Sequence, residues 1–475
     1  MKIHYPDWVL KYKRKGTAIH KIGNNFYLYE VESRWDKKLK RARKITKGYL
    51  GKITPEGLKE PGYKINRPTT CKEYGASFFL IKEGKKIIEK LKEHFPNRWK
   101  QIFILSALRF MYQAPLKHMK LHYLDSWLSE ELAGVSFSKN ILHQIIEDVG
   151  RDRCAIVQFL KDFICGNENL LIDLTHVFSL SNNIALAEKG YNSQWDFTPQ
   201  LNLLFIFSLD KKFPLFYRIL PGTVRDVSSL KATIQESGIK NVIIIADRGF
   251  YSNNNIQLLE KEHLKYILPL KRNSQLIDYS ILQQGTKKSF AGYFKFKKRF
   301  IWYYRCCKGL PVWVFVDDSL KAEEEQDYLS RIETHPELGY TIENFHKKAH
   351  SFGTIALITN LEGLPASKIF EYFKSRVEIE QLIDTFKNTL KADKTYMRSD
   401  YSFEGWMFIN YLSLVYYYKV YQQLLEKDLL SRYSPSDVLL YLSKYRRVKV
   451  STHWVDLEIP KQTRKLIEIL GLHIT

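Results

Sequence analysis

The sequence has few cysteines, and none has the spacing of a zinc-binding motif. The one adjacent pair, Cys306-Cys307, is not a zinc pattern, and Cys71, Cys154 and Cys165 stand alone. We therefore expect no zinc site of the finger or ribbon type. Reduced thiols, as found in the cytoplasm, are the expected state of all five residues.

The sequence also lacks a long uninterrupted apolar run. Its opening residues, MKIHYPD, have no apolar core of the kind found in signal peptides. The best candidate for a membrane span, 406–425, contains Asn410, Lys419, two glutamines and many tyrosines, so it predicts a buried amphipathic helix instead. We expect a cytoplasmic, nucleoid-associated protein with no membrane partner.

Basic residues outnumber acidic residues in this sequence. The chain has 74 Lys and Arg against 51 Asp and Glu, a net charge of +23. Such an excess favours a polyanionic partner, although a lysine-rich proteome would produce a similar balance without one. The length of 475 residues allows several domains and a large core, and the 14% aromatic content excludes wholesale disorder.

Three acidic residues have contexts suited to binding a metal ion beside phosphate. Asp173 ends the apolar run 170–172, Asp247 ends the run 242–246, and Glu380 lies in a later helical segment. Two carboxylates at strand ends and one on a helix can converge on a single point. Such a group binds Mg²⁺, a hard cation that takes oxygen ligands. Two ions about 4 Å apart can activate the attacking oxygen and stabilise the leaving one.

The helical segment adds cations at regular spacing. Phe373, Arg376, Glu380 and Lys387 fall within roughly 60° of one another on an ideal helix, and Arg and Lys both suit phosphate oxygens. Glu378 is the competing third acid, but it lies about 160° from Glu380 and off this stripe. Taken singly, each feature has an ordinary explanation. Arg376 and Glu380 could form a plain helix ion pair, and an aspartate after an apolar strand is usually a turn residue. Their conjunction favours Glu380 and a phosphoryl-transfer site.

These residues resemble the DDE transposases of bacterial insertion sequences, in the group with the signature Tyr-x2-Arg-x3-Glu-x6-Lys. The matching segments are LLIDLTHV, VIIIADRGFYS and RVEIEQLIDTFKNTLK, one for each acid. Two further segments look like this group, FYRILPGTVRDVSSLKATI and WDKKLKRARKITKGYLGKITPEG. The resemblance covers most of the chain. One position departs from it, because Phe373 stands where the family has Tyr, with Tyr372 beside it.

The resemblance implies a site, a cofactor and partners. The implied catalytic and metal-binding residues are Asp173, Asp247 and Glu380, holding two Mg²⁺ ions with Mn²⁺ as a substitute. The implied DNA-phosphate contacts are Arg248, Arg376 and Lys387. Water attacks a phosphodiester at the element end, and the released 3′-hydroxyl then attacks target DNA. The partners are double-stranded transposon ends and target DNA, and the expected assembly is a homodimer in the synaptic complex.

The order of predicted elements gives the fold class. Apolar runs at 170–173, 201–209 and 213–220 precede alternating helix and strand, an order that the resemblance identifies as ribonuclease-H-like. A generic α/β sheet would also place the two aspartates at carboxyl ends of strands, where ligands bind. We expect an α/β protein with a ribonuclease-H-like mixed sheet core and a β-rich insertion, preceded by a small basic β segment and a helical domain. The predicted domains are a basic β-rich segment (1–74), a helical, DNA-binding domain (75–165), two core parts (166–274 and 351–425) around the β-rich insertion (275–350), and a C-terminal helical region (426–475).

Local signals refine this outline. Glycines such as Gly48 and Gly51 predict short strands joined by turns in the first segment. In the helical domain, Ser138 is a candidate N-cap and Gly150 a helix stop. This domain either recognises transposon-end DNA or merely connects its neighbours. The acidic link 323–325 looks like an exposed turn.

Three groups of residues each allow a functional and a structural interpretation. The basic run has candidate DNA-backbone contacts, or is a solvated loop between strands; the candidates are Lys37, Lys38, Arg41 and Arg43. Trp302 and Tyr303 stack on an extruded base, or pack within ordinary strands. His176 supports the site from a second layer or against phosphate, or is a structural histidine.

Two other functions fit the same residues. One is a nuclease or resolvase of the same fold that cuts DNA without strand transfer. The other is a non-catalytic DNA-binding descendant, against which the presence of all three acids argues. A strand-joining assay with pre-cut 3′-hydroxyl ends separates the transposase from the nuclease.

Overall fold

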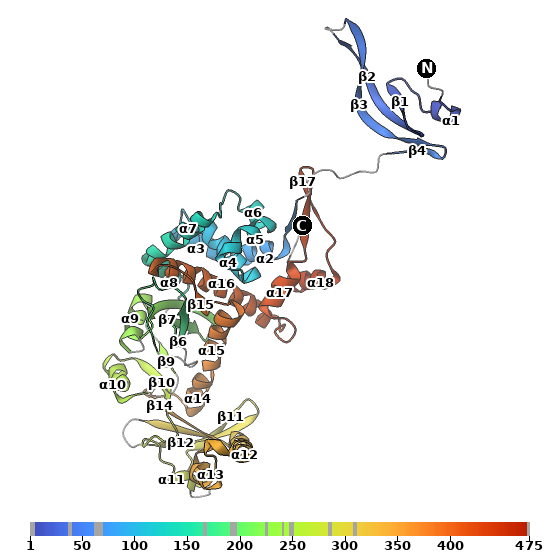
Figure 1. Ribbon diagram of the computed structural model, residues 1–475. Coiled ribbons are helices and arrows are strands. Elements are labelled where there is room, and N and C mark those ends of the chain that lie inside the picture. Colours follow the sequence, from blue (N-terminus) through green and yellow to red (C-terminus); the bar gives the residue numbers. More distant parts are fainter. Residues whose placement is uncertain are drawn as a thin grey trace. The chain divides into compact units, whose positions relative to one another are not determined.

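The computed structural model describes residues 5–36, 40–60, 70–164, 169–190, 197–223, 227–239, 242–246, 251–283, 287–306 and 311–472 (Figure 1). By their internal contacts they form two compact units. The first comprises Met1–Thr70 with Val448–Val455, and the second Cys71–Arg447 with Asp456–Thr475.

The first unit holds a four-stranded antiparallel sheet, in the order β1-β2-β3-β4, and one short helix. Its elements are α1 (Asp7–Leu10), β1 (Thr17–Ile22), β2 (Asn25–Asp36), β3 (Arg41–Thr54) and β4 (Gly57–Lys59). Val9 of α1 packs with Phe26, Leu28 and Ile53 in a small core. Since Phe26 and Leu28 alternate along β2, this core lies on one face of the sheet.

Strands β2 and β3, of 12 and 14 residues, are longer than the short strands predicted for this segment. Gly48 and Gly51, which suggested turns, both lie inside β3, and the pairing with β2 shifts register twice. Gly51 has φ +148°, and a Cβ atom there would lie 2.5 Å from the carbonyl oxygen of Lys59. Gly51 therefore permits the close approach of β4, and neither glycine ends the strand.

The second unit begins with a helical region. Its elements are β5 (Cys71–Glu73), α2 (Gly75–Glu83), α3 (Lys85–His94), α4 (Trp99–Tyr112), a 3-10 turn (Leu116–His118), α5 (Met119–Asp125), α6 (Leu128–Glu131), α7 (Lys139–Arg151) and α8 (Arg153–Lys161). The predicted cap is confirmed, because the Ser138 hydroxyl accepts a hydrogen bond from the Ile141 amide.

Two sheets follow. One has the order β15-β6-β7-β8, and the other β11-β12-β13-β14-β10-β9, with β6 and β9 in contact. The elements up to the insertion are β6 (Leu170–Ser179), β7 (Gln200–Ser208), β8 (Phe213–Pro221), α9 (Val227–Ser237), β9 (Ile243–Ile245), α10 (Asn253–Lys261) and β10 (Lys265–Pro269). This is the predicted order, three consecutive strands and then alternating helix and strand, and the structure shows that the three strands are antiparallel.

The insertion extends the second sheet and adds helices. Its elements are α11 (Ser280–Gln283), a 3-10 turn (Lys287–Ser289), β11 (Gly292–Phe296), β12 (Arg299–Cys306), β13 (Val312–Asp317), α12 (Asp318–Thr334), a 3-10 turn (Pro336–Leu338), α13 (Ile342–Lys348) and a further 3-10 turn (Ala349–Ser351). The predicted acidic turn at 323–325 is wrong, because these residues lie within α12. Asp317 caps that helix by accepting from the Ser319 and Leu320 amides, so the helix begins five residues before Glu323.

The last part of the chain is mainly helical. Its elements are β14 (Thr354–Thr359), α14 (Ala366–Lys374), α15 (Arg376–Asp384), a π-helical turn (Thr385–Thr389), β15 (Lys394–Thr395), α16 (Asp400–Glu426), α17 (Pro435–Leu442), β16 (Arg446–Val450), β17 (His453–Asp456) and α18 (Lys461–Leu470). Within the described ranges, no helix is long and apolar enough to cross a membrane. α16 contains residues 406–425, the candidate membrane span in the sequence, and is buried against α4, α7 and β8.

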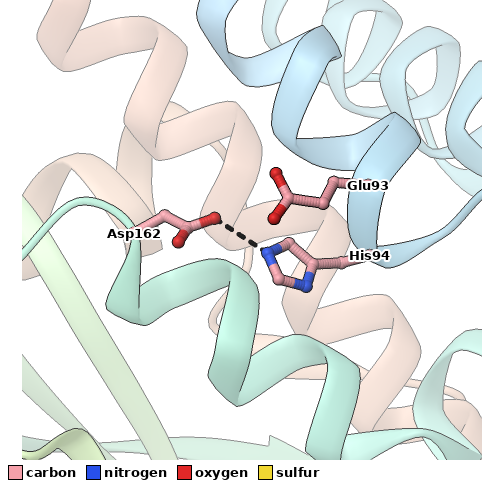
Figure 2. A group of neighbouring side chains, drawn as sticks. All are labelled: Glu93, His94 and Asp162. Atoms are coloured by element: carbon pink, nitrogen blue, oxygen red, sulfur yellow. Dashed lines mark hydrogen bonds and ion pairs between the residues drawn. The ribbon is translucent and has the colours of Figure 1, made fainter.

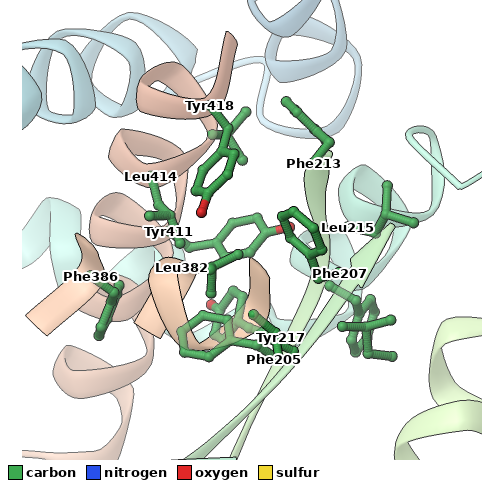
Figure 3. Close-up of a cluster of buried hydrophobic side chains, with 14 of the residues drawn as sticks. Phe205, Phe207, Phe213, Leu215, Tyr217, Leu382, Phe386, Tyr411, Leu414 and Tyr418 are labelled. Carbon is green, nitrogen blue, oxygen red and sulfur yellow. The ribbon is translucent and has the colours of Figure 1, made fainter. Parts of the chain in front are cut away.

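An aromatic core joins the sheet β15-β6-β7-β8 to α15, α16 and the π-helical turn. Figure 3 shows Tyr411 of α16 beside Tyr217 of β8, with ring centroids 4.9 Å apart. Phe386 of the π-helical turn meets Phe205 of β7 at 5.2 Å. Leu382 of α15 is fully buried in the same cluster. The helix that carries Glu380 is therefore fixed to the sheet by its apolar face.

Helices α7 and α16 cross closely at two glycines. A Cβ atom on Gly150 would lie 1.8 Å from the carbonyl oxygen of Tyr401, and one on Gly405 would lie 1.9 Å from that of Ile146. The prediction that Gly150 stops α7 is wrong, since the helix continues to Arg151. Gly150 is required by the neighbouring backbone, which no local pattern reveals.

We expect Gly150→Ala to destabilise the second unit by about 3 kcal/mol, because the added methyl group must push two helix backbones apart. Thermal unfolding checks this. Gly48→Ala is the control, since its Cβ atom would meet only the Glu30 carboxylate at 4.0 Å, and should change stability by less than about 0.5 kcal/mol. Equal effects of the two substitutions would contradict the close crossing.

Candidate active site

Asp173 lies inside a strand and not at its end. It is the fourth residue of β6, stands opposite Phe205 of β7, and is half-buried. Its carboxylate accepts a hydrogen bond of 2.9 Å from the Leu174 amide. The predicted strand end at Asp173 is therefore wrong. The strand continues because Thr175 and Val177, both β-branched, pair with β7 and are buried.

The second acid follows a strand that contacts β6. β9 ends at Ile245, two residues before Asp247, and β6 and β9 lie against each other. Asp247 and Arg248 themselves are outside the described residues. The placement of the second acid beside Asp173 therefore remains a prediction, supported by this contact between strands.

The helix predicted to carry Phe373, Arg376, Glu380 and Lys387 on one face is divided into three parts. α14 ends at Lys374, and at the junction the Ser375 hydroxyl donates to the Tyr372 carbonyl at 2.6 Å. α15 carries the arginine and the glutamate, and the lysine lies in the π-helical turn. Since π turns hold more residues per turn than α-helices, ideal helical angles do not relate the first and last members of this stripe.

Arg376 and Glu380 form an ion pair on α15. The guanidinium Nη2 lies 3.2 Å from the Glu380 carboxylate, whose side chain is 51% exposed. Arg376 Nε is buried and has no hydrogen-bond partner among the described residues. The pair thus presents an accessible carboxylate beside a cation that retains donor capacity, which suits a metal ion next to a phosphate.

The competing acid, Glu378, has a different environment. Its carboxylate pairs with the Lys212 ammonium at 2.9 Å, which ties α15 to the turn between β7 and β8. This ion pair gives Glu378 a structural role. Lys387 is half-buried, and burial lowers the pKa of its ammonium, opposed by the charge of Asp393.

Two other candidates from the sequence lie on β6 or contact the residue just before it. The ring of half-buried His176 lies 4.9 Å from that of Phe178, two residues along β6. The Tyr372 hydroxyl hydrogen-bonds Asn169 Oδ1 at 3.2 Å, just before β6 begins. Tyr372 therefore links α14 to the strand that carries Asp173, while the neighbouring Phe373 offers no hydroxyl.

A buried arginine that the sequence interpretation missed holds the end of the acid-bearing helix. Arg109 of α4 is 4% exposed, and its guanidinium donates to the carbonyls of Leu390 and Lys391, which follow the π-helical turn. It also donates to the Gln113 carbonyl at 2.7 Å and to Asn410 Oδ1 of α16 at 2.8 Å. Burial lowers its pKa to about 10. The available signal was a single arginine inside an apolar helix.

Trp302 and Tyr303, the candidates for base stacking, lie on opposite faces of β12. Trp302 shares one face with Tyr293, 61% exposed, at 5.0 Å between ring centroids, and the Lys287 ammonium lies 4.7 Å from the indole ring. Tyr303 turns to the other face, where it contacts Phe315. Trp302 therefore belongs to an aromatic surface with an exposed tyrosine and a nearby cation, whereas Tyr303 packs among Phe294, Trp313 and Phe315.

A second group could hold a metal ion by its geometry. Figure 2 shows Glu93, His94 and Asp162, whose ligand atoms lie within 4.8 Å of one another. However, the Lys90 ammonium lies 2.8 Å from Glu93 and 3.2 Å from Asp162. Because a lysine already supplies the positive charge, we interpret this group as an ion-pair network that joins α3 to α8.

Asp173 on β6 and Glu380 on α15 lie in the segment that carries the two contacting sheets. Comparison with known families identifies it, since the family described as "Transposase DDE domain" matches residues 170–416, more than half of the chain. The chain belongs to this DDE transposase family. Membership implies DNA transposition as the class of activity and a ribonuclease-H-like domain at 170–416.

Other comparisons add little detail. No curated protein matches the chain. Among solved structures, the cryo-EM structure of the piggyBac transposase synaptic complex with hairpin DNA overlaps 78% of this chain and 80% of its own, at 9% identity and a TM-score of 0.37. That likeness is too low to define the arrangement of this chain's elements.

We expect Arg109→Met to destabilise the second unit by about 3 kcal/mol, because several buried carbonyls lose a charged donor. Denaturant unfolding measures the loss. Arg331→Met is the control, since this arginine is exposed and pairs only with groups at the surface, and should cost less than about 1 kcal/mol. A neutral Arg109→Met would contradict the role of this arginine.

Proposed function

We propose that this chain is the transposase of an insertion sequence, which cuts DNA at the ends of its element and joins those ends to target DNA. The main support is the family match, since 170–416 contains Asp173, Asp247 and Glu380. The proposed partner is double-stranded DNA, bound by a homodimer in the synaptic complex at the nucleoid.

The acidic residues suit magnesium chemistry. Asp173 is half-buried, and the Glu380 carboxylate is half-exposed beside Arg376. Oxygen donors of this kind fit Mg²⁺, so we propose that Asp173, Asp247 and Glu380 hold two Mg²⁺ ions, with Mn²⁺ as a substitute. When bound, such ions stabilise the attacking and leaving oxygens of phosphoryl transfer.

The neighbouring cations would bind the DNA strand. We propose that Arg376 and Lys387 contact the phosphates that flank the scissile bond, together with Arg248. The Arg376 side chain remains 21% exposed beside Glu380, so its terminal N–H groups can donate to a phosphate oxygen. A phosphate would also compensate Lys387 for the hydration that it loses on burial. Trp302, rather than Tyr303, is the proposed stacking residue.

We expect Glu380→Gln to reduce end cleavage about a hundredfold or more while leaving DNA binding largely intact, because the carboxylate serves chemistry and binding is spread over many cations. Asp173→Asn and Asp247→Asn should behave alike. Glu378→Gln is the matched control on the same helix and should retain most activity. If cleavage survives Glu380→Gln and is lost in Glu378→Gln, the third acid is Glu378.

We expect Phe373→Tyr to keep or increase the rate of end cleavage. A hydroxyl at this position gains about 1 kcal/mol, up to fivefold in rate, if it reaches a phosphate oxygen. Tyr372→Phe should lower stability slightly, because it removes the hydrogen bond to Asn169, without a specific loss of cleavage. A neutral Phe373→Tyr together with an inactive Tyr372→Phe would show that Tyr372 supplies the hydroxyl.

The nuclease alternative predicts a different product. A transposase joins pre-cut 3′-hydroxyl ends to a target duplex, whereas a nuclease or resolvase only cuts. Joined products in this assay, dependent on Glu380, support the proposed function. Cleavage without joining would favour the nuclease, and binding without either reaction the non-catalytic descendant.

A further inference from the structure

Strands β2 and β3 extend beyond the sheet of the first unit as a free ribbon. β1 pairs with residues 25–30 of β2, and β4 pairs with residues 52–54 of β3. Residues 31–36 and 41–46 pair as strands only with each other, and at the base of this ribbon the Val31 amide also donates to the Gly16 carbonyl. We call these twelve residues the β-arm.

The β-arm has no apolar core to explain its folding. Residues 32–35 and 41–46 are all exposed, and the exposed fraction of the Trp35 side chain reaches 64%. An isolated two-stranded ribbon is at best marginally stable in water. A bound partner would therefore stabilise it.

The charges of the β-arm indicate the chemistry of that partner. Arg34 stands directly opposite Arg43, so both side chains lie on one face of the ribbon. Like charges placed opposite each other destabilise a strand pair. Neither Arg34 nor Arg43 forms an ion pair within the part of the chain that the structure describes. An anionic partner would relieve this repulsion.

The dimensions favour duplex DNA over an acidic protein. Six paired residues span about 20 Å at roughly 3.4 Å each. The major groove, about 12 Å wide, admits a two-stranded ribbon, and arginine is the side chain that most often reads guanine there. The β-arm is a narrow ribbon with two opposed arginines, Arg34 and Arg43, so its width and its charge both suit this groove.

We propose that the β-arm enters the major groove of duplex DNA, with Arg34 and Arg43 toward the base edges. Lys44, on the opposite face beside Ser33, lies near the phosphates at the groove margin. This inference rests on the proposed function for its partner, DNA. It assigns recognition to a part of the chain that lies outside the family match at 170–416.

The test compares two double variants of the full chain. Arg34→Ser with Arg43→Ser changes the β-arm, and Lys13→Ser with Lys15→Ser removes the same charge from exposed positions outside it. Binding is measured on duplexes cut from each end of the DNA segment that carries the gene. We expect the first variant to bind about 10-fold to 100-fold more weakly and the second to bind nearly as the parent chain does. Thermal unfolding should be unchanged in both.

Dimethyl sulfate distinguishes the grooves, because it methylates guanine N7 in the major groove and adenine N3 in the minor groove. We expect protection of guanine N7 by the parent chain and its loss in the Arg34/Arg43 variant. Protection of adenine N3 alone, or equal binding by the two variants, would overturn the inference while leaving the proposed function intact. Failure of the parent chain to bind either end duplex would overturn both.

Discussion

The architecture depends on one buried cation, Arg109, that satisfies carbonyls from separate parts of the chain. A helix ends with carbonyls that have no intrahelical partner, and burying them without donors is costly. The Arg109 guanidinium bonds the end of its own helix and the carbonyls of Leu390 and Lys391, and reaches α16 through Asn410. The helical region thereby fixes where the helix carrying Glu380 ends, although 281 residues separate Arg109 from Leu390.

Packing supplies the other constraints on this helix. Leu382 and Phe386 bury its apolar face against β7, and Glu378 ties its polar side to Lys212. The glycines at the α7–α16 crossing let α16 pass close to the helical region. Of the two candidate acids on α15, Glu378 and Glu380, Glu380 is the one that remains exposed. The candidate site thus depends on strand pairing for β6, on apolar packing for α15, and on hydrogen bonds from Arg109 for the segment that follows α15.

The sequence predicted correctly those features that depend on residues close together in the chain. The Ser138 cap, the strand order of the core and the buried helix at 406–425 follow from periodicity and capping signals within a few residues. The misjudged features depend on distant neighbours. Gly150 faces the backbone of α16, Asp173 continues into a strand because β7 pairs with it, and Arg109 meets carbonyls far along the chain. Contacts between residues so far apart in the chain produce no clear pattern in a single sequence.

The central claim is that Asp173, Asp247 and Glu380 share one metal site. Fe²⁺ can replace Mg²⁺ in oxygen-ligand sites, and with ascorbate and peroxide it cuts the polypeptide near the bound ion. Fragment mapping in the presence of duplex DNA therefore tests the claim most directly. The account predicts cuts near residues 173, 247 and 380, suppressed by excess Mg²⁺ and weakened together by Asp173→Asn. Cuts confined to the neighbourhood of Glu93 and Asp162, or cuts near 380 that persist in Asp173→Asn, would contradict it.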